Sequence, residues 1–372
     1  MLPCLYEADE LSFSSLGLGG LHDAQQIRVT GGVNAPPELE MRYPVRGRRF
    51  ADLQLRRIIT ATTGAGGGRQ PFRIYRITKP LDGTCTVYAR HLVYDLMGYT
   101  VDPFAAQSPS GAAHKLTNGA TADHGFNITV EITSSTPLKV DTPRSVWSML
   151  GGQKGSLLDV YGGEWEFDFR SAVLRDRIGA NNGVAVRYGV NLKSCEQDEN
   201  LANCWTAVHP FWHNPTDGTT VTLPEHILSA GTFDYTRILA LDLSSEFETA
   251  PTQDQLRSRA QQYISSNQIG VPAVGLDVDF VPLSQTEDYK DKTQLQQLSL
   301  GDTVTVYFPS AYDLDTGRAS TMTAATARVV ETVWLPLENR YEHIRIGEKR
   351  ANFVSAVATV QKNTEWLMTR VR

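Results

Sequence analysis

Two cysteines and two histidines near the middle of the chain are the residues best suited to bind a metal. Thiolate sulfur and imidazole nitrogen are the ligands that zinc prefers, and four of them complete a tetrahedral site. The candidate ligands are Cys195, Cys204, His209 and His213. Structural zinc sites usually pair their cysteines about two to four residues apart, whereas these cysteines are nine positions apart. The spacing therefore favours a buried strand over a zinc site, and we expect no metal.

Two glycine-rich stretches match phosphate-binding loops only in part. A phosphate loop needs G-x-x-x-x-G-K-[ST] between a strand and a helix, but in "GGQKGS" Lys154 precedes Gly155. In "GAGGGR" Arg69 stands where the dinucleotide motif needs its last glycine, and no helical pattern follows. We therefore predict a turn and a hairpin tip, and no bound cofactor.

Three acidic residues share one face of a predicted strand: Glu164, Glu166 and Asp168. A pair of carboxylates can hydrolyse glycosidic bonds, but like charges along one strand face are typically solvated. The motifs G-x-S-x-G and H-E-x-x-H are absent from the sequence. Residue chemistry alone predicts no catalytic site.

Five arginines form a basic run, and they are the candidate interface residues: Arg46, Arg48, Arg49, Arg56 and Arg57. Such a run is typical of a solvated face, or of an interface with an acidic partner. Direct contact with nucleic acid is less favoured, because no aromatic stacking residues alternate with the arginines.

Most of the elements that must position these residues are strands. In "ELEMRYP", Leu39, Met41 and Tyr43 alternate with charged residues, as in a strand with one wet face. A long strand is predicted from Thr84 to about Leu92, and "PFRIYRI" alternates only roughly. Further on, 164–170 and 184–192 predict the two strands of a hairpin that turns at "GANNG".

Helices are few. Pro143–Leu150 is predicted as a two-turn helix with Thr142 as N-cap and Gly151 at the left-handed C-terminal position. A longer helix is predicted over Thr252–Asn267, and a short one around Ala112–Leu116.

Composition limits the class of protein. The chain has 372 residues, 41% hydrophobic and 20% charged, which predicts a folded protein of two to four domains. Its net charge of −6 provides no general attraction for nucleic acid or anionic membranes. Acidic residues near the N-terminus argue against a secretory signal, and four cysteines in so long a chain predict reduced thiols in the host cytoplasm.

Four segments, in order, resemble the prophage tail protein family of Gram-positive hosts, whose members form the N-terminal structural part of a tail-associated lysin or endopeptidase. They are "MLPCLYEADELSFSSLGLGGLHDA", "ELEMRYPVRGRRFADLQLRRII", "QPFRIYRITKPLDGTCTVYARHLVYDL" and "VWSMLGGQKGSLLDVYGGEWEFDFRSAVLRDRIGANNGVAVRYGVNL". The resemblance covers residues 1 to about 215 most strongly.

The resemblance implies a mainly β fold similar to the baseplate hub protein of contractile-tailed phages. Each chain of such a trimer contributes two similar antiparallel β-barrels, discontinuous in sequence, to a pseudo-hexameric ring. The expected divisions are a first barrel at 1–100, completed by part of 205–245, and a second at 101–204, completed by part of 300–350. The segment 246–299 is expected as an inserted α+β domain, and 351–372 as a C-terminal helix or tail.

The implied function is a structural hub in the tail tip or baseplate of a virion or phage-tail-like particle. As a homotrimer it would join the six-fold tail tube to the three-fold tip, and its acidic wall would let DNA pass unbound. Expected partners are the distal tail or tail-tube ring, the tape measure protein, and fibre, spike or receptor-binding proteins.

Family members often carry a lytic C-terminal extension. This chain ends at Arg372, so we expect no enzyme activity. The alternatives are a tail-associated cell-wall hydrolase and a carbohydrate-binding tip module that uses Trp147, Trp165, Trp205 and Trp212.

Overall fold

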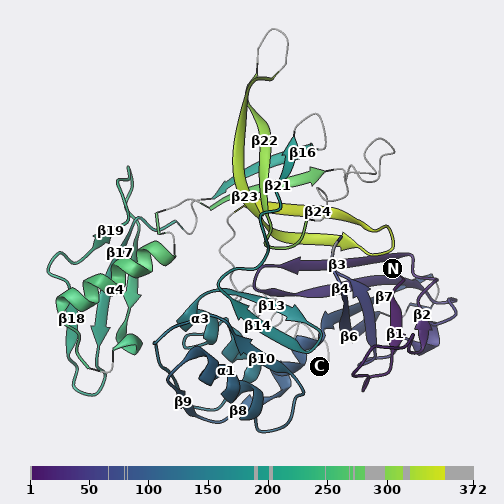
Figure 1. Cartoon of the computed structure of the whole chain (residues 1–372), viewed down its shortest axis with the longest axis horizontal. Helices are drawn as coiled ribbons and strands as arrows, with labels where there is room; N and C mark the ends of the chain where they lie inside the picture. The colour runs from purple at the N-terminus through teal and green to yellow at the C-terminus, as the bar shows by residue number, and fades with distance from the viewer. Residues whose placement is uncertain are drawn as a thin grey trace. The chain divides into compact units, whose positions relative to one another are not determined.

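The structure is a computed structural model of the chain, described over residues 2–65, 67–78, 80–81, 83–187, 192–200, 204–247, 249–267, 269–270, 273–280, 298–312 and 319–347. Backbone contacts divide the chain into two compact units. Unit 1 contains residues 1–196 and 276–372, and unit 2 contains residues 197–275. The mainly β class expected from the sequence is confirmed (Figure 1). No helix in the described part of the chain has the length and apolar character needed to cross a membrane.

Unit 1 is built on a thirteen-stranded sheet in the order β16-β21-β24-β23-β3-β4-β7-β6-β5-β1-β2, with β22 pairing with β23 and with β15. The strands are β1 (Cys4–Tyr6), β2 (Gly19–Gly20), β3 (Gln26–Gly32), β4 (Ala35–Pro44), β5 (Ile58–Thr62), β6 (Arg69–Thr78), β7 (Thr84–His91), β15 (Val184–Arg187), β16 (Leu192–Asn200), β21 (Ala273–Phe280), β22 (Thr303–Tyr312), β23 (Ala319–Leu335) and β24 (Arg340–Gly347). Over the described residues this strand order is open, so the two barrels and the ring remain predictions.

The alternating pattern of the first hundred residues forms the expected half-buried strands. Leu39, Met41 and Tyr43 are buried on one face of β4, and the predicted strand from Thr84 is β7. The looser pattern of "PFRIYRI" has a physical cause, because the register of β6 against β7 shifts between Ile74 and Arg76. A shift of this kind inserts a residue into one strand and breaks the alternation.

The strand that extends this sheet comes from near the end of the chain. β23 pairs antiparallel with β3, and Trp334 lies opposite Val29. The expectation that part of 205–245 completes the first barrel stays a prediction; those residues belong to unit 2. Trp334 is buried and donates its indole N–H to Thr62 Oγ1 at 3.0 Å, which anchors β23 to the N-terminal strands.

A second hydrophobic core in unit 1 is enclosed by short elements. They are η2 (Leu92–Gly98), β8 (Thr100–Val101), β9 (Phe104–Ala106), α1 (Pro109–Asn118), β10 (Asn127–Val130), β11 (Leu138–Val140), β12 (Arg144–Ser145), α2 (Val146–Leu150), α3 (Leu157–Tyr161), β13 (Glu164–Asp168) and β14 (Ser171–Arg175). β10, β14 and β13 form a three-stranded sheet. Its inner face buries Trp165 and Leu174, whereas Glu166 and Arg175 lie on the opposite face.

Two local predictions are corrected in this region. α2 begins at Val146 with Ser145 as its N-cap, because Arg144 and Ser145 pair with β8 and cannot be helical. Gly151 is extended, and Gly152 takes the positive φ of 86° instead. α1 is longer than the predicted 112–116 helix.

The predicted hairpin is also tighter than expected. β13 pairs with β14 across Phe169 and Arg170, and the predicted second strand contains β15, which pairs in parallel with β22. The dipeptide Phe169-Arg170 carries no glycine turn signal, so the sequence pattern gave no sign of this turn.

Unit 2 is a two-layer α/β unit. β17 (Ala207–His213) lies between β18 (Thr220–Thr222) and β19 (Leu228–Ser229) on one side and the parallel strand β20 (Ile238–Asp242) on the other. η3 (Ser244–Glu246) precedes α4 (Gln253–Ser266), the helix predicted over 252–267. α4 lies across one face of the sheet (Figure 1) and packs Leu256 and Ala260 against Val208 and Trp212. The tail 351–372 lies outside the described residues.

Candidate functional site

The five candidate interface arginines divide into two groups. Arg49 binds Asp52 at 3.1 Å, and Arg57 binds Glu7 at 2.9 and 3.1 Å and the Asp52 carbonyl at 2.7 Å. Arg46, Arg48 and Arg56 are exposed. The run therefore contains one arginine that binds within its own turn, one that joins the 50–57 segment to the N-terminal loop, and three that are exposed.

Asp23 fixes the turn that carries Arg48. Its carboxylate accepts hydrogen bonds from the Arg48 backbone N–H at 2.7 Å and the Tyr43 hydroxyl at 3.2 Å. The hydrogen bond from Arg48 N–H is the main cause that lowers the pKa of Asp23. The Arg48 side chain thus projects from a backbone position that is held by an ionised group.

Two apolar side chains near the exposed arginines are themselves exposed. One precedes Arg56 in the sequence, and the other lies on the N-terminal loop that Arg57 binds through Glu7. Leu55 is 59% exposed between Arg56 and the 50–52 turn, and Leu11 is 67% exposed on the loop that follows Glu7. We call Arg48, Leu55 and Arg56 the arginine-loop surface. A surface that combines guanidinium groups with an apolar side chain has the composition of protein interfaces.

The three acidic residues that a glycosidase hypothesis would need are each occupied. Glu164 binds Arg328 at 2.6 and 2.7 Å, and Glu166 binds Arg175 at 2.7 Å. Asp168 accepts a hydrogen bond from the Gln70 amide at 2.7 Å. Two of the three like charges are therefore balanced by arginines, and the third accepts a hydrogen bond from a neutral amide; the sequence pattern could not show these partners.

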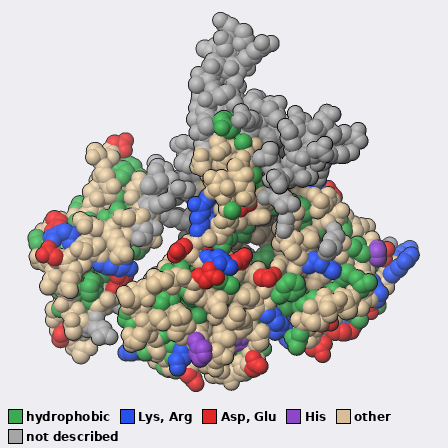
Figure 2. All heavy atoms as spheres, in the orientation of Figure 1, with side chains coloured by type: hydrophobic (Ala, Val, Ile, Leu, Met, Phe, Trp, Pro, Cys, Tyr) green, Lys and Arg blue, Asp and Glu red, His purple; other side chains and the backbone are tan. Residues whose placement is uncertain are grey.

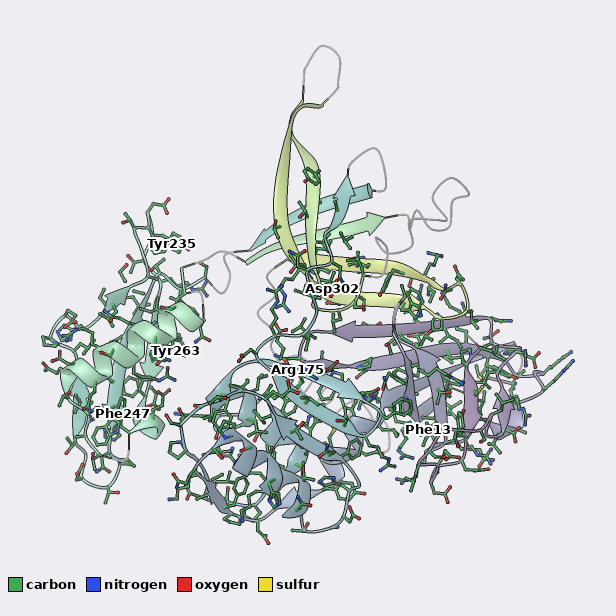
Figure 3. All side chains as sticks on the ribbon, viewed as in Figure 1. Phe13, Arg175, Tyr235, Phe247, Tyr263 and Asp302 are labelled. Atoms are coloured by element: carbon green, nitrogen blue, oxygen red, sulfur yellow. The ribbon has the colours of Figure 1, made fainter. Side chains whose placement is uncertain are left out.

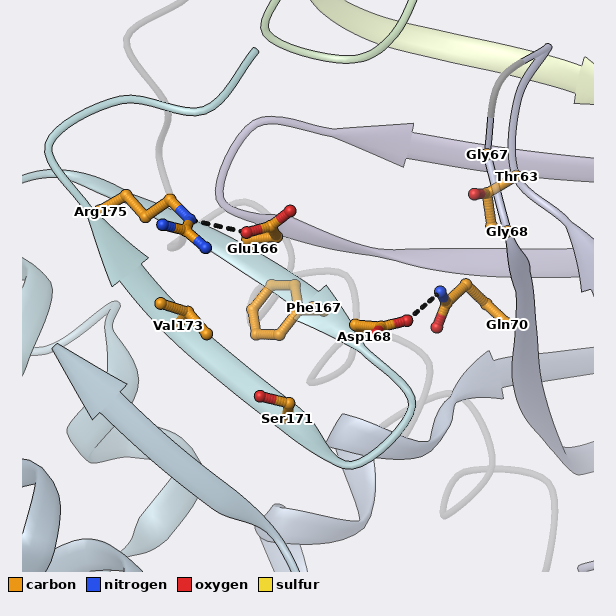
Figure 4. A pocket seen from close by; sticks show the side chains of 10 residues that line it. All are labelled: Thr63, Gly67, Gly68, Gln70, Glu166, Phe167, Asp168, Ser171, Val173 and Arg175. Carbon is orange, nitrogen blue, oxygen red and sulfur yellow. Dashed lines mark hydrogen bonds and ion pairs between the residues drawn. The ribbon is translucent and has the colours of Figure 1, made fainter. Parts of the chain in front are cut away.

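Glu166 and Asp168, with their partners Arg175 and Gln70, lie in a polar cavity of about 470 Å³ between the β5–β6 hairpin and the β13–β14 hairpin (Figure 4). It is lined by Thr63, Gly67, Gly68, Gln70, Glu166, Phe167, Asp168, Ser171, Val173 and Arg175. Figure 3 shows Arg175 on the β13–β14 hairpin, and its guanidinium also contacts Glu131. Within this cavity Glu166 and Arg175 bind each other, and Asp168 binds the neutral amide of Gln70.

A buried network joins the large sheet to β13. His91 Nδ1 accepts the Val93 N–H, so His91 Nε2 carries the proton and donates to Gln70 Oε1 at 3.1 Å. Gln70 Oε1 also accepts the Phe169 N–H at 2.9 Å. Burial lowers the pKa of His91 to about 3, so the imidazole is neutral at neutral pH. The network therefore positions the hairpin rather than transferring protons.

Each candidate zinc ligand in the described residues contacts a different neighbour. Cys204 is buried beside Tyr235, and His209 packs its ring edge-on against His226 at 6.2 Å. His213 Nδ1 bonds Thr220 Oγ1 at 2.9 Å. The Cys195 side chain lies outside the described residues, and within them no three His, Cys, Asp or Glu side chains are grouped as metal ligands.

The "GGQKGS" stretch forms a helix cap instead of a phosphate cradle. Ser156 caps α3 by accepting the Asp159 N–H, and Asp159 in turn accepts the Gly155 N–H at 2.8 Å. A carboxylate of the chain thus occupies the backbone donor that a phosphate would use. The sequence pattern missed α3, because five residues are too few to show a helical period.

Three of the four tryptophans of the carbohydrate-binding alternative are inside the protein. Trp147, Trp165 and Trp212 are 2–4% exposed, and Trp205 stacks with the Arg237 guanidinium at 4.7 Å. Buried rings cannot stack on a sugar. Acidic and basic side chains are interleaved in small groups on the face drawn in Figure 2, without a large patch of one sign among the described residues.

Solved structures of prophage and bacterial tail proteins share the fold of this chain. No protein-family model matches the chain, and neither does any curated protein. The prophage tail protein gp18 from Listeria monocytogenes EGD-e matches with a TM-score of 0.56 at 15% identity, over 97% of this chain and 99% of that one. The tail protein from Neisseria meningitidis MC58 matches with a TM-score of 0.56 at 11% identity, over 90% and 94%. The 43 kDa tail protein of prophage MuSo2 from Shewanella oneidensis matches with a TM-score of 0.50 at 15% identity, over 87% and 94%. The resemblance to prophage tail proteins is confirmed as a shared fold.

Proposed function

We propose that this chain is a structural hub protein in the tail of a phage or phage-tail-like particle. The observation that carries the proposal is that the fold of a prophage tail protein is matched over nearly the full length of both chains. A fold alone does not determine function, so the chemistry of the surface must also agree. The surface chemistry agrees with a structural role, because the acids that a hydrolase would need, Glu164, Glu166 and Asp168, each bind another side chain of the same chain.

In the finer proposal the chain acts as a trimer. Three copies, each with two barrel-like halves, would form a pseudo-hexameric ring between the six-fold tail tube and the three-fold tip. Two separate hydrophobic cores in unit 1, one under the large sheet and one around α1 and α2, support two halves per chain. The net charge of −6 is compatible with a channel that DNA crosses without binding.

The arginine-loop surface is the proposed contact with a neighbouring ring of the tail, either the distal tail protein or the tube protein. Arg48 and Arg56 are exposed, and so is the apolar side chain of Leu55, which lies between them in the sequence. The tape measure protein and the fibre, spike or receptor-binding proteins are the other proposed partners. Under this proposal the protein is located in the virion tail after assembly in the host cytoplasm.

The solution mass of the purified full-length chain tests the proposed function. Sedimentation equilibrium over a wide concentration range should give the mass of three chains, with negative-stain images of rings. A monomer at every concentration, together with measurable release of fragments from peptidoglycan, would support the hydrolase alternative instead.

A further inference from the structure

Among the described residues of unit 2, β20 pairs with β17 on one side and forms an edge of the sheet. Arg237 C=O accepts from the Thr206 N–H at 2.8 Å, and Leu243 N–H donates to Phe211 C=O at 2.9 Å. In a parallel pair, alternate residues of a strand point their backbone groups to the same neighbour. The odd-numbered residues of β20 therefore bond to β17, and the even-numbered residues face outward.

The outward backbone groups of Ile238 and Ala240 have no hydrogen-bond partner in the described residues. No hydrogen bond from the backbone N–H or C=O of Ile238 or Ala240 occurs within the part of the chain that the structure describes. The strand reads Ile-Leu-Ala-Leu-Asp, with no proline and no basic residue, and Ile238 is 40% exposed. Proteins usually protect such an edge with charge, proline, a bulge or a covering loop.

The same chain protects another edge by a specific device. The N–H groups of Asn127 and Glu131 donate to the Arg170 and Leu174 carbonyls, so the backbone N–H groups of Trp165 in β13 and of Phe169 in the turn after it point away from β14. The Asn34 side chain then bonds Gly163 C=O at 3.1 Å and Trp165 N–H at 2.7 Å, while Gln70 bonds Phe169 N–H. Two side-chain amides thus cover the edge of β13, whereas in the described residues no side chain covers Ile238 and Ala240 of β20.

We propose that β20 is a docking edge for an extended segment of another protein, which adds a strand to the sheet of unit 2. Main-chain hydrogen bonds give affinity in this mode of binding, and alternate side chains give specificity. The free N–H and C=O groups of Ile238 and Ala240 supply the hydrogen bonds.

The side chains beside this edge indicate the chemistry of the partner. Leu239 and Leu241 face the core under α4, and Ile238 and Ala240 lie on the other face of the sheet. Four of the five side chains of β20 are apolar, and its one charged residue, Asp242, stands at the end of the strand. An incoming strand should therefore carry mainly β-branched or other apolar residues and few charges. Tyr235, labelled in Figure 3, lies in the loop before β20 and is 36% exposed, which offers a further aromatic contact.

A labelled peptide tests the proposal with the full-length chain. The probe is acetyl-Thr-Val-Thr-Val-Thr-amide carrying a fluorophore, and its binding is measured by fluorescence anisotropy. Ala240→Pro removes the outward N–H, and proline is tolerated at edge positions whose N–H faces solvent. Ile238→Lys places a charge on the edge. Ile227→Lys is the matched control, because Ile227 is also 40% exposed but lies outside β20.

We expect saturable binding that weakens at least about tenfold in Ala240→Pro and Ile238→Lys, and by less than about twofold in Ile227→Lys, since tenfold is 1.4 kcal/mol. A peptide with N-methylated alternate amides should not bind. Equal binding by all variants, or no binding by the wild-type chain, overturns the proposal. Self-association that Ala240→Pro abolishes would show that a second copy occupies the edge, and would also overturn it.

Amide hydrogen exchange gives an independent result if Ala240→Pro does not fold. In the free wild-type chain, Leu239 and Leu241 amides should exchange slowly and Ile238 and Ala240 amides rapidly. Slow exchange at all four positions would show that the edge is already covered, which contradicts the proposal.

Discussion

Arg328 binds Glu164 through both terminal guanidinium nitrogens, at 2.6 and 2.7 Å, although 164 positions separate them in the sequence. Arg328 also donates to Gly301 C=O at 3.1 Å and Ile178 C=O at 3.0 Å. One side chain therefore connects β23, β13 and the loops that precede β15 and β22.

Removing this connection should destabilise unit 1. Arg328→Met leaves the Glu164 carboxylate, whose side chain is 14% exposed, without its charged partner. We expect a loss of about 3 kcal/mol in the free energy of unfolding, measured with urea. Arg175→Met is the control, because its partners are about half exposed, and it should cost less than about 1 kcal/mol. Equal losses in the two variants would contradict this assignment.

His91 should make the stability of unit 1 depend on pH in the acid range. Burial lowers the pKa of His91 to about 3, so between the unfolded value of 6.5 and 3 the unfolded chain binds the additional proton. The contribution of His91 to the free energy of unfolding is thus greatest above about pH 6.5, and it declines by about 1.4 kcal/mol per pH unit as the pH falls below that value.

The measurement is urea unfolding of the wild-type chain and His91→Gln at pH 7 and pH 5. From pH 7 to pH 5 the wild type should lose about 2 kcal/mol more than the variant. If both proteins respond to pH equally, His91 is not buried and neutral as described.

The N-terminus of α4 should depend on Thr252. Its hydroxyl accepts the Gln255 N–H at 3.3 Å, and the Gln255 side chain accepts the Thr252 N–H at 2.9 Å. Thr252→Ala should cost about 1 kcal/mol, seen as faster hydrogen exchange in the first turn of α4. Ser258→Ala, in the middle of the same helix, should not accelerate exchange. Unchanged exchange in Thr252→Ala would exclude the capping role.

The arginine-loop surface should separate docking from stability. Arg48→Glu together with Arg56→Glu should abolish incorporation into assembled tails and leave the unfolding midpoint unchanged. Arg49→Met together with Arg57→Met removes the bonds to Asp52 and Glu7 and should lower the midpoint. Normal incorporation of the first double variant would contradict the proposed contact.

Much of the fold follows from local pattern, but the pairing of distant segments does not. The alternation of Leu39, Met41 and Tyr43 predicted β4, and the spacing of Leu256 and Ala260 predicted α4. The strand that extends the N-terminal sheet was not predicted, because several later segments alternate equally well and the sequence contains no register information between them.

The charged residues show the same limit. The sequence pattern placed Glu164, Glu166 and Asp168 on one strand face, as β13 has them. It could not assign Arg328, Arg175 and Gln70 as their partners, since ion pairs and side-chain hydrogen bonds depend on distances that only the folded chain sets. For the same reason it could not separate the paired Arg57 from the exposed Arg56.

The copy number of this chain in assembled tails tests the central claim most directly. Electron cryo-microscopy of the phage or phage-tail-like particle to which this chain belongs should show three copies around the axis at the tail tip. These copies should contact the neighbouring ring through Arg48 and Arg56. Particles with complete tails that lack this chain, or that contain it away from the tip, would contradict a structural hub.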